Sequence, residues 1–125
     1  MIDDDEEDHE IFKEAIAEVD TAIDCVTVTS CDAGLNYLKA NLQNLPGYIF
    51  LDLNMPKMNG KQCLEKLKKD KDLQNIPVVI YTTSYQAKDK EDTASLGASY
   101  FMTKPTSLKD LKKEVQSILT MEIRH

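Results

Sequence analysis

The chain has 125 residues and a formal net charge of −7, with 42% apolar and 30% charged residues. This length predicts a single domain over residues 1–125, and the composition is typical of a water-soluble globular protein. The acidic balance argues against a direct nucleic-acid partner, and no stretch reaches the ~20 apolar residues of a membrane span. Because no signal peptide is visible either, we expect a cytoplasmic protein.

Helical and strand patterns alternate along the first half of the chain. Residues 6–19 carry apolar side chains at helical spacing, and residues 24–29 form a short β-branched run that predicts a strand. Asp32 is placed to cap a helix that runs to about Asn41. The acidic residues 5–8 are interpreted as the favourable N-terminus of the first helix.

The same alternation continues to the end of the chain. The predicted strands are residues 48–51, 76–81 and 100–102, and the predicted helices are residues 60–69, 86–96 and 108–119. Such an order predicts an α/β fold, in which helices cover both faces of a parallel sheet. The helix over 86–96 offers only Ala87, Ala94 and Leu96 as apolar surface, so we expect it to be the most weakly docked.

Reactive side chains follow the predicted strands where each strand ends. Ile2 leads into an acidic run, and the next strands lead into Asp52, Thr82 and Lys104. The carboxyl ends of parallel strands lie along one edge of a sheet, so these groups should converge. Carboxylates without histidine or thiolate favour Mg²⁺, and a carboxylate beside that ion can act as a nucleophile toward phosphorus. Thr82 and Lys104 could then bind the other phosphoryl oxygens.

Four segments that span residues 3–105 together resemble the motifs of response-regulator receiver domains. They are Asp3-Asp4-Asp5, Phe50 to Pro56, Thr82-Thr83-Ser84 and Lys104-Pro105. The run D-x-N-M-P-x-M-[ND]-G, here Asp52 to Gly60, is the most specific of them. The resemblance implies a flavodoxin-like doubly wound parallel sheet with strand order 2-1-3-4-5. The Thr-Thr-Ser stretch and the Asn-Ile-Pro before the fourth strand resemble short stand-alone regulators of bacterial phytochrome-type kinases.

The resemblance also implies roles for the acidic residues. By position, Asp52 resembles the phosphoacceptor of the family. Asp4 resembles its direct Mg²⁺ ligand, and Asp3 the acid that acts on the metal through water. Asn54 resembles the residue whose backbone carbonyl completes the metal shell. Mg²⁺ is the only cofactor that this comparison implies.

Three further residues resemble the switch elements of receiver domains. Thr82 matches the switch hydroxyl, Lys104 the phosphate-pairing lysine, and Phe101 the rotating aromatic residue. The family pattern implies that phosphorylation changes the face formed by residues 84–119. We further expect a cis peptide bond at Lys104-Pro105, because proline allows one at modest cost and the lysine must turn into the site.

These implications lead to a functional hypothesis and two alternatives. The protein would be a two-component phosphoacceptor switch, not an enzyme beyond its own phosphotransfer and dephosphorylation. Its partners would be a histidine kinase or phosphotransfer protein and an unknown output protein or a second copy of the chain. One alternative is a phosphorylation-independent interaction module that has kept the fold. A haloacid-dehalogenase type phosphohydrolase is disfavoured, because Asn54 stands where that family has an acid.

Two local features complete the expectations. Only Met1 and Ile2 precede Asp3, so the first strand should be truncated to a stub or its place taken by another segment or another chain. His9 is interpreted as a solvated or hydrogen-bonded histidine and not as a phosphoryl donor. The three cysteines, which form no C-x-x-C motif, are expected to be reduced thiols.

Overall fold

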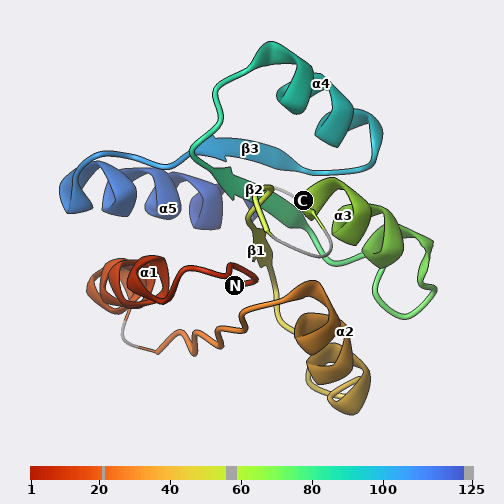
Figure 1. Ribbon diagram of the computed structural model, residues 1–125. Coiled ribbons are helices and arrows are strands. Elements are labelled where there is room, and N and C mark those ends of the chain that lie inside the picture. The colour runs from red at the N-terminus through yellow and green to blue at the C-terminus, as the bar shows by residue number, and fades with distance from the viewer. Residues whose placement is uncertain (21, 56–58, 123–125) are drawn as a thin grey trace.

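The computed structural model describes residues 1–20, 22–55 and 59–122 and has an α/β fold (Figure 1). Helices and strands alternate along it much as the sequence pattern predicts. In chain order the elements are α1 (Glu6–Val19), α2 (Cys31–Ala40), β1 (Ile49–Leu51), α3 (Gly60–Lys69), β2 (Val78–Thr82), α4 (Ala87–Ser95), β3 (Tyr100–Thr103) and α5 (Leu108–Glu122). Within these residues, no helix is both long enough and apolar enough to cross a membrane.

The sheet is parallel and has the predicted strand order. β1 pairs with β2 and β2 pairs with β3, with Leu51 opposite Ile80 and Ile80 opposite Phe101. Ile2 forms isolated parallel bridges to Leu51 on one side and to Val28 on the other. The order across the molecule therefore corresponds to 2-1-3-4-5, with the first two positions reduced to single bridges.

The N-terminal residues form the stub that the sequence predicts. The Ile2 N–H donates to the Phe50 carbonyl at 2.8 Å, and the Val28 N–H donates to the Met1 carbonyl at 2.9 Å. The predicted strand over 24–29 is wrong, because in the described part of the chain Met1 and Ile2 offer it only the contacts at Val26 and Val28. An open cavity of about 640 Å³ lies beside this stub, between α1, α2 and the start of β1.

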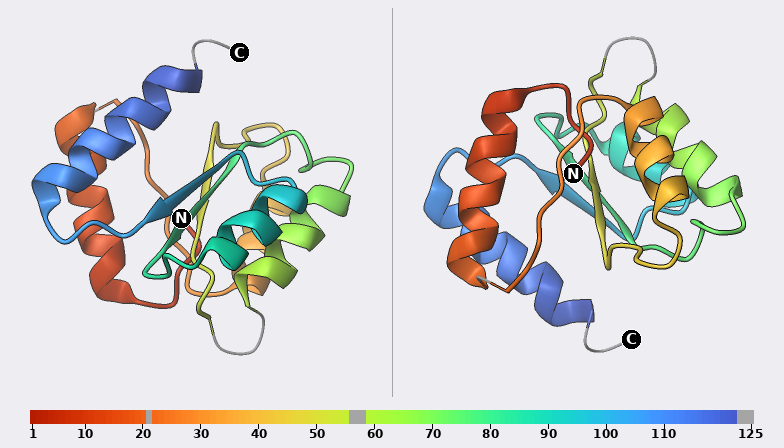
Figure 2. Two further views of the ribbon diagram at one scale, coloured as in Figure 1. Left: turned by 90° about the horizontal axis from the view of Figure 1, so that it is seen from above. Right: turned by 90° about the horizontal axis from the view of Figure 1, so that it is seen from below.

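Helices cover both faces of the sheet, since alternate strand residues point to opposite faces. α1 and α5 lie on one face, and α2, α3 and α4 lie on the other, as the two views of Figure 2 show. On the first face the ring of Phe12 of α1 lies tilted against the ring of Phe50, with their centroids 4.7 Å apart. Leu111 and Val115 of α5 are fully buried. The predicted apolar stripes of both helices thus form one core.

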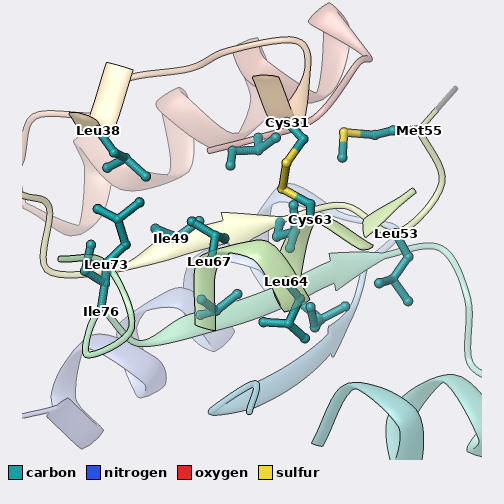
Figure 3. Close-up of a cluster of buried hydrophobic side chains, with 14 residues drawn as sticks. Cys31, Leu38, Ile49, Leu53, Met55, Cys63, Leu64, Leu67, Leu73 and Ile76 are labelled. Carbon is teal, nitrogen blue, oxygen red and sulfur yellow. A yellow bond between two sulfur atoms is a disulfide. The ribbon is translucent and has the colours of Figure 1, made fainter. Parts of the chain in front are cut away.

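The second face holds a disulfide bond inside its core (Figure 3). Cys31 of α2 is bonded to Cys63 of α3, with their Cα atoms 5.8 Å apart. The expectation of reduced thiols is therefore wrong for these two residues, although Cys25 is free. The cause is the packing of α2 beside α3 on one face, which a separation of 32 residues in the sequence does not reveal.

The N-cap of α2 differs from the prediction, whereas the docking of α4 agrees with it. Ser30 and not Asp32 caps α2, since its hydroxyl accepts the Ala33 N–H at 3.1 Å. Asp32 lies in the first turn, where it suits the helix dipole. α4 has no side-chain cap and buries only Thr93, which agrees with its predicted weak docking.

Candidate functional site

The ends of the strands bring the predicted polar residues together. Asp52 follows β1, Thr82 ends β2, and Lys104 follows β3 directly. Asp3, Asp4 and Asp52 each place a carboxylate oxygen within 4.8 Å of the other two. The predicted convergence is confirmed as geometry, because parallel strands share one carboxyl edge.

Asp52 lies in the middle of this group and is only 4% exposed. Burial raises the pKa of its carboxyl to about 6, and the charge of Asp3 adds to the rise. The Lys104 ammonium and a hydrogen bond from the Asn54 backbone offset part of this rise in pKa. Among the described residues, Asp52 Oδ1 is buried without a hydrogen-bond partner. A buried oxygen without a hydrogen-bond partner is costly, so this atom is suited to coordinate a cation or to form a bond to phosphorus.

Lys104 is the cation of the site. Its Nζ lies 2.9 Å from Asp3 Oδ2, 2.5 Å from Asp8 Oδ2 and 3.9 Å from Asp52 Oδ1. Burial lowers the pKa of Lys104, but the hydrogen bonds to Asp8 and Asp3 and the charge of Asp52 outweigh burial and raise it. Lys104 is therefore charged throughout the physiological range.

The predicted cis bond at Lys104-Pro105 is wrong, because the described residues contain no cis peptide bond. The backbone N–H of Lys104 donates to the Thr82 carbonyl at 2.6 Å, which continues the pairing of β3 with β2. From that position the long side chain reaches Asp3 with the ordinary trans bond. The turn that the cis bond was expected to supply is not needed.

Asp8 is a site residue that the sequence prediction missed. The acidic run was interpreted as a helix N-terminus, and Asp5 does act as the N-cap, accepting the Glu7 N–H at 2.9 Å. Asp8, however, lies in the first turn of α1 and its carboxylate contacts Lys104. Helical side chains lean toward the N-terminus of their helix, so Asp8 leans toward the edge that carries Asp3.

His9 agrees with the interpretation as a hydrogen-bonded histidine. Its ring is buried, and Nε2 lies 2.6 Å from the Asp3 carbonyl oxygen. The Asp3 carboxylate is held as well, since its Oδ1 accepts the Asp5 N–H at 3.0 Å. These two contacts fix the orientation of the first acidic residue.

Thr82 is fully buried, and its hydroxyl is connected to both sides of the site. Its Oγ1 accepts weak hydrogen bonds from the Asn54 side-chain amide at 3.4 Å and from the Ser84 N–H at 3.3 Å. Phe101, the predicted aromatic switch residue, is half-buried on β3. Its rotation and the metal role of the Asn54 carbonyl stay predictions.

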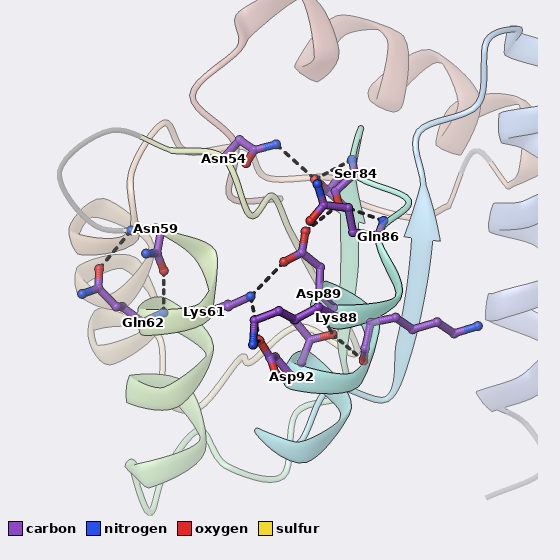
Figure 4. Close-up of polar contacts among 12 residues, drawn as sticks. Asn54, Asn59, Lys61, Gln62, Ser84, Gln86, Lys88, Asp89 and Asp92 are labelled. Atoms are coloured by element: carbon purple, nitrogen blue, oxygen red, sulfur yellow. Dashed lines mark hydrogen bonds and ion pairs between the residues drawn. The ribbon is translucent and has the colours of Figure 1, made fainter.

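Ser84 connects Thr82 to helix α4 (Figure 4). The Ser84 hydroxyl donates to Asp89 Oδ2 at 2.5 Å, and Lys61 of α3 pairs with Asp89 at 2.8 Å and with Asp92 at 2.9 Å. A contiguous set of polar contacts thus runs from the site to α4 and from there to α3. Residues 56–58 of the motif lie outside the described residues.

Gly60 explains why the motif ends in glycine. A Cβ at this position would lie 2.3 Å from the Asp52 carbonyl oxygen and 2.6 Å from the Leu53 Cα, both backbone atoms. The Gly60 N–H also donates to the Leu53 carbonyl at 3.0 Å. Only glycine lets the start of α3 approach the backbone of Asp52 and Leu53 this closely.

Gly60→Ala is expected to lower the free energy of unfolding by about 1–3 kcal/mol, since the extra methyl group has no space. Urea denaturation of the variant measures this loss. Gly34→Ala is the matched control, because its Cβ would meet side-chain atoms of Ile2 and Val28 and no backbone atom among its nearest neighbours. A loss in Gly34→Ala as large as that in Gly60→Ala would contradict the account of the close approach.

Comparison with known proteins identifies the family. The family model described as response regulator receiver domain matches residues 1–116. The chain belongs to the response regulator receiver domain family. Receiver domains of this family are signalling switches and not classical enzymes.

Similar proteins include regulators that are linked to phytochromes. Response regulator Rcp1 of Synechocystis is 44% identical over 73 residues, which are 58% of this chain and 50% of Rcp1. The chain thus matches about half the length of that relative. The crystal structure of the phosphorylated cyanobacterial phytochrome response regulator RcpA has a TM-score of 0.83 at 32% identity, over 94% of this chain and 86% of RcpA. The crystal structure of the Mn²⁺-bound form of Rcp1 has a TM-score of 0.74 at 32% identity, over 94% of this chain and 87% of the Rcp1 chain.

Proposed function

We propose that this receiver domain is the phosphoacceptor switch of a two-component system and that Asp52 accepts the phosphoryl group. The observation that carries the proposal is the buried Asp52 Oδ1, which lacks a hydrogen-bond partner among the described residues and lies 3.9 Å from the Lys104 ammonium. The donor would be the phosphohistidine of a histidine kinase or a phosphotransfer protein, in the cytoplasm. Apart from its own phosphotransfer and dephosphorylation, the domain would catalyse no reaction.

A divalent cation fits the acidic group of the site. Asp3, Asp4 and Asp52, with the backbone carbonyl of Asn54, would hold Mg²⁺, because these ligands are all oxygen atoms. The relative Rcp1 has a Mn²⁺-bound form, which supports a site for a hard cation. When bound, Mg²⁺ supplies positive charge that neutralises the oxygens of the transferring phosphoryl group.

The residues of the chain account for the rest of the transfer. An oxygen of the Asp52 carboxylate forms a bond to phosphorus while the bond between phosphorus and the donor imidazole nitrogen breaks. The electron pair of the broken bond stays on that nitrogen. Lys104 pairs with one phosphoryl oxygen by charge, and the Thr82 hydroxyl donates to another.

The contacts of Thr82 indicate how the signal would leave the site. A Thr82 hydroxyl that turns toward the phosphoryl group would no longer accept the Ser84 N–H, and Ser84 is bonded to Asp89 of α4. Because α4 is weakly docked, it would shift first, and Phe101 would turn inward behind Thr82. The changed face of residues 84–119 would then bind an output protein or a second copy of the chain.

Beryllofluoride separates this function from a phosphorylation-independent interaction module. With Mg²⁺ present, wild type should give a bound fluorine resonance in ¹⁹F NMR, and Asp52→Asn should give none. If wild type binds no beryllofluoride, the interaction module becomes the better account.

The same reagent tests the path through Thr82. Beryllofluoride should change amide exchange in residues 84–104 of wild type, because Thr82 moves toward the bound group. Thr82→Ala should lose most of this change while it still binds beryllofluoride. Thr83→Ala, which alters an exposed neighbour, is the control and should behave like wild type. An undiminished change in Thr82→Ala would remove Thr82 from the switch.

A further inference from the structure

The Lys104 ammonium is held by hydrogen bonds to two carboxylates, and Asp52 is not one of them. Its hydrogen bonds go to Asp3 and to Asp8, whereas Asp52 Oδ1 at 3.9 Å is beyond hydrogen-bond distance. The Lys104 side chain is only 11% exposed, and the Asp8 side chain 23%. Asp8 belongs to α1, so this helix fixes the position of a cation that β3 delivers.

The carboxylate oxygens around Lys104 differ in whether they already accept a hydrogen bond. Both oxygens of Asp3 are occupied, Oδ1 by the Asp5 N–H and Oδ2 by Lys104 itself. Asp52 Oδ1 has no hydrogen-bond partner among the described residues. Without the Asp8 carboxylate, the Lys104 ammonium would lose one of its two charged hydrogen-bond acceptors. A buried charge that lacks an acceptor is costly, so the ammonium would move to Asp52 Oδ1 and form a hydrogen bond there.

We propose that Asp8 is a positioning residue that holds Lys104 away from the Asp52 carboxylate and so keeps this carboxylate open to Mg²⁺. The inference rests on the proposed function, because it concerns the same carboxylate and the same cation. Lysine has three N–H donors, so pairing with Asp3 and Asp8 leaves one for a phosphoryl oxygen. Asp8 therefore keeps Lys104 from pairing closely with Asp52 before Mg²⁺ binds, and it still leaves Lys104 able to contact a phosphoryl oxygen.

The direct test is titration with Mg²⁺ alone, followed by amide chemical shifts or by calorimetry. Asp8→Asn should lower Mg²⁺ affinity about tenfold, because the freed ammonium competes for Asp52. Asp8→Glu keeps a carboxylate and should recover most of the loss. Glu7→Gln removes the same charge from an exposed neighbour, and a change of less than about twofold is expected there.

A variant that lacks Lys104 shows whether Asp8 acts on Mg²⁺ binding through Lys104 or directly through its own negative charge. In Lys104→Met the added substitution Asp8→Asn should change Mg²⁺ affinity no more than Glu7→Gln does, because no ammonium is left to move. The double variant removes two opposite charges and is expected to fold, which circular dichroism checks. A tenfold loss that persists without Lys104 would overturn the proposal.

The outcomes also distinguish this inference from the proposed function. If wild type takes up no phosphoryl group, the proposed function fails, whatever Asp8 does. If wild type is phosphorylated and binds Mg²⁺, but Asp8→Asn titrates like Glu7→Gln, only the role of Asp8 is overturned. Failure of Asp8→Glu to recover affinity above that of Asp8→Asn would overturn it as well.

Discussion

Replacing Lys104 with methionine is expected to lower the free energy of unfolding of the metal-free protein by about 3–5 kcal/mol. The ammonium lies 2.9 Å from the fully buried Asp3 and contacts Asp8, and it is the nearest positive charge to Asp52 that the described contacts show. Without it, buried carboxylates repel one another with no counter-charge. Urea denaturation at pH 7.5 with a chelator present measures the loss.

Two comparisons make this result specific. Lys61→Met also removes a lysine that pairs with two carboxylates, but these partners lie near the surface, so a much smaller loss is expected. Added Mg²⁺ should restore part of the stability of the Lys104 variant, since a second cation can replace the lost charge. Equal losses in the two variants would contradict the account of buried charge.

Asp52→Asn is expected to raise the free energy of unfolding of the metal-free protein by about 1–3 kcal/mol at neutral pH. Burial and the charge of Asp3 raise the pKa of Asp52 from 3.8 to about 6, so its ionised form is disfavoured in the folded state. An amide of the same shape removes that charge. Under the proposed function the same substitution should abolish phosphorylation, so Asp52 would serve function at the expense of stability.

The pH dependence of this gain has a definite sign. Between pH 3.8 and about 6 the folded state of wild type binds more protons than the unfolded state, so wild type loses stability as pH rises through this window. The amide introduced by Asp52→Asn does not titrate, so the advantage of the variant should be about half as large at pH 5 as at pH 7.5. Saturating Mg²⁺ should reduce or reverse the advantage. An advantage that does not depend on pH would contradict the assigned pKa.

The part of the site that lies at strand ends could be predicted from the sequence. A parallel sheet has one carboxyl edge, so Asp52, Thr82 and Lys104 meet there once their strands are recognised. Asp8 could not be found in this way, because its position depends on how α1 crosses that edge. The trans bond at Lys104-Pro105 was missed for a related reason, since the reach of the lysine depends on where Asp3 lies.

The differences in the fold also have physical causes. The β-branched residues 24–29 have the composition of a strand, yet a strand needs a paired neighbour. Within the described residues, Met1 bonds to Val26 and Val28 and Ile2 forms a single bridge to Val28, which is too little for a strand. The Cys31–Cys63 disulfide depends on the contact between α2 and α3, which no local pattern encodes. Element types follow from periodicity, whereas contacts between elements depend on packing of the whole chain.

Intact mass after incubation with acetyl phosphate and Mg²⁺ tests the central claim most directly. Wild type should gain the mass of one phosphoryl group, and the gain should disappear when a chelator removes the metal. Asp52→Asn should show no gain under the same conditions, while Asp5→Asn, which alters the N-cap of α1, should still be labelled. Labelling of Asp52→Asn at the rate of wild type would contradict the assignment of Asp52 as the phosphoacceptor.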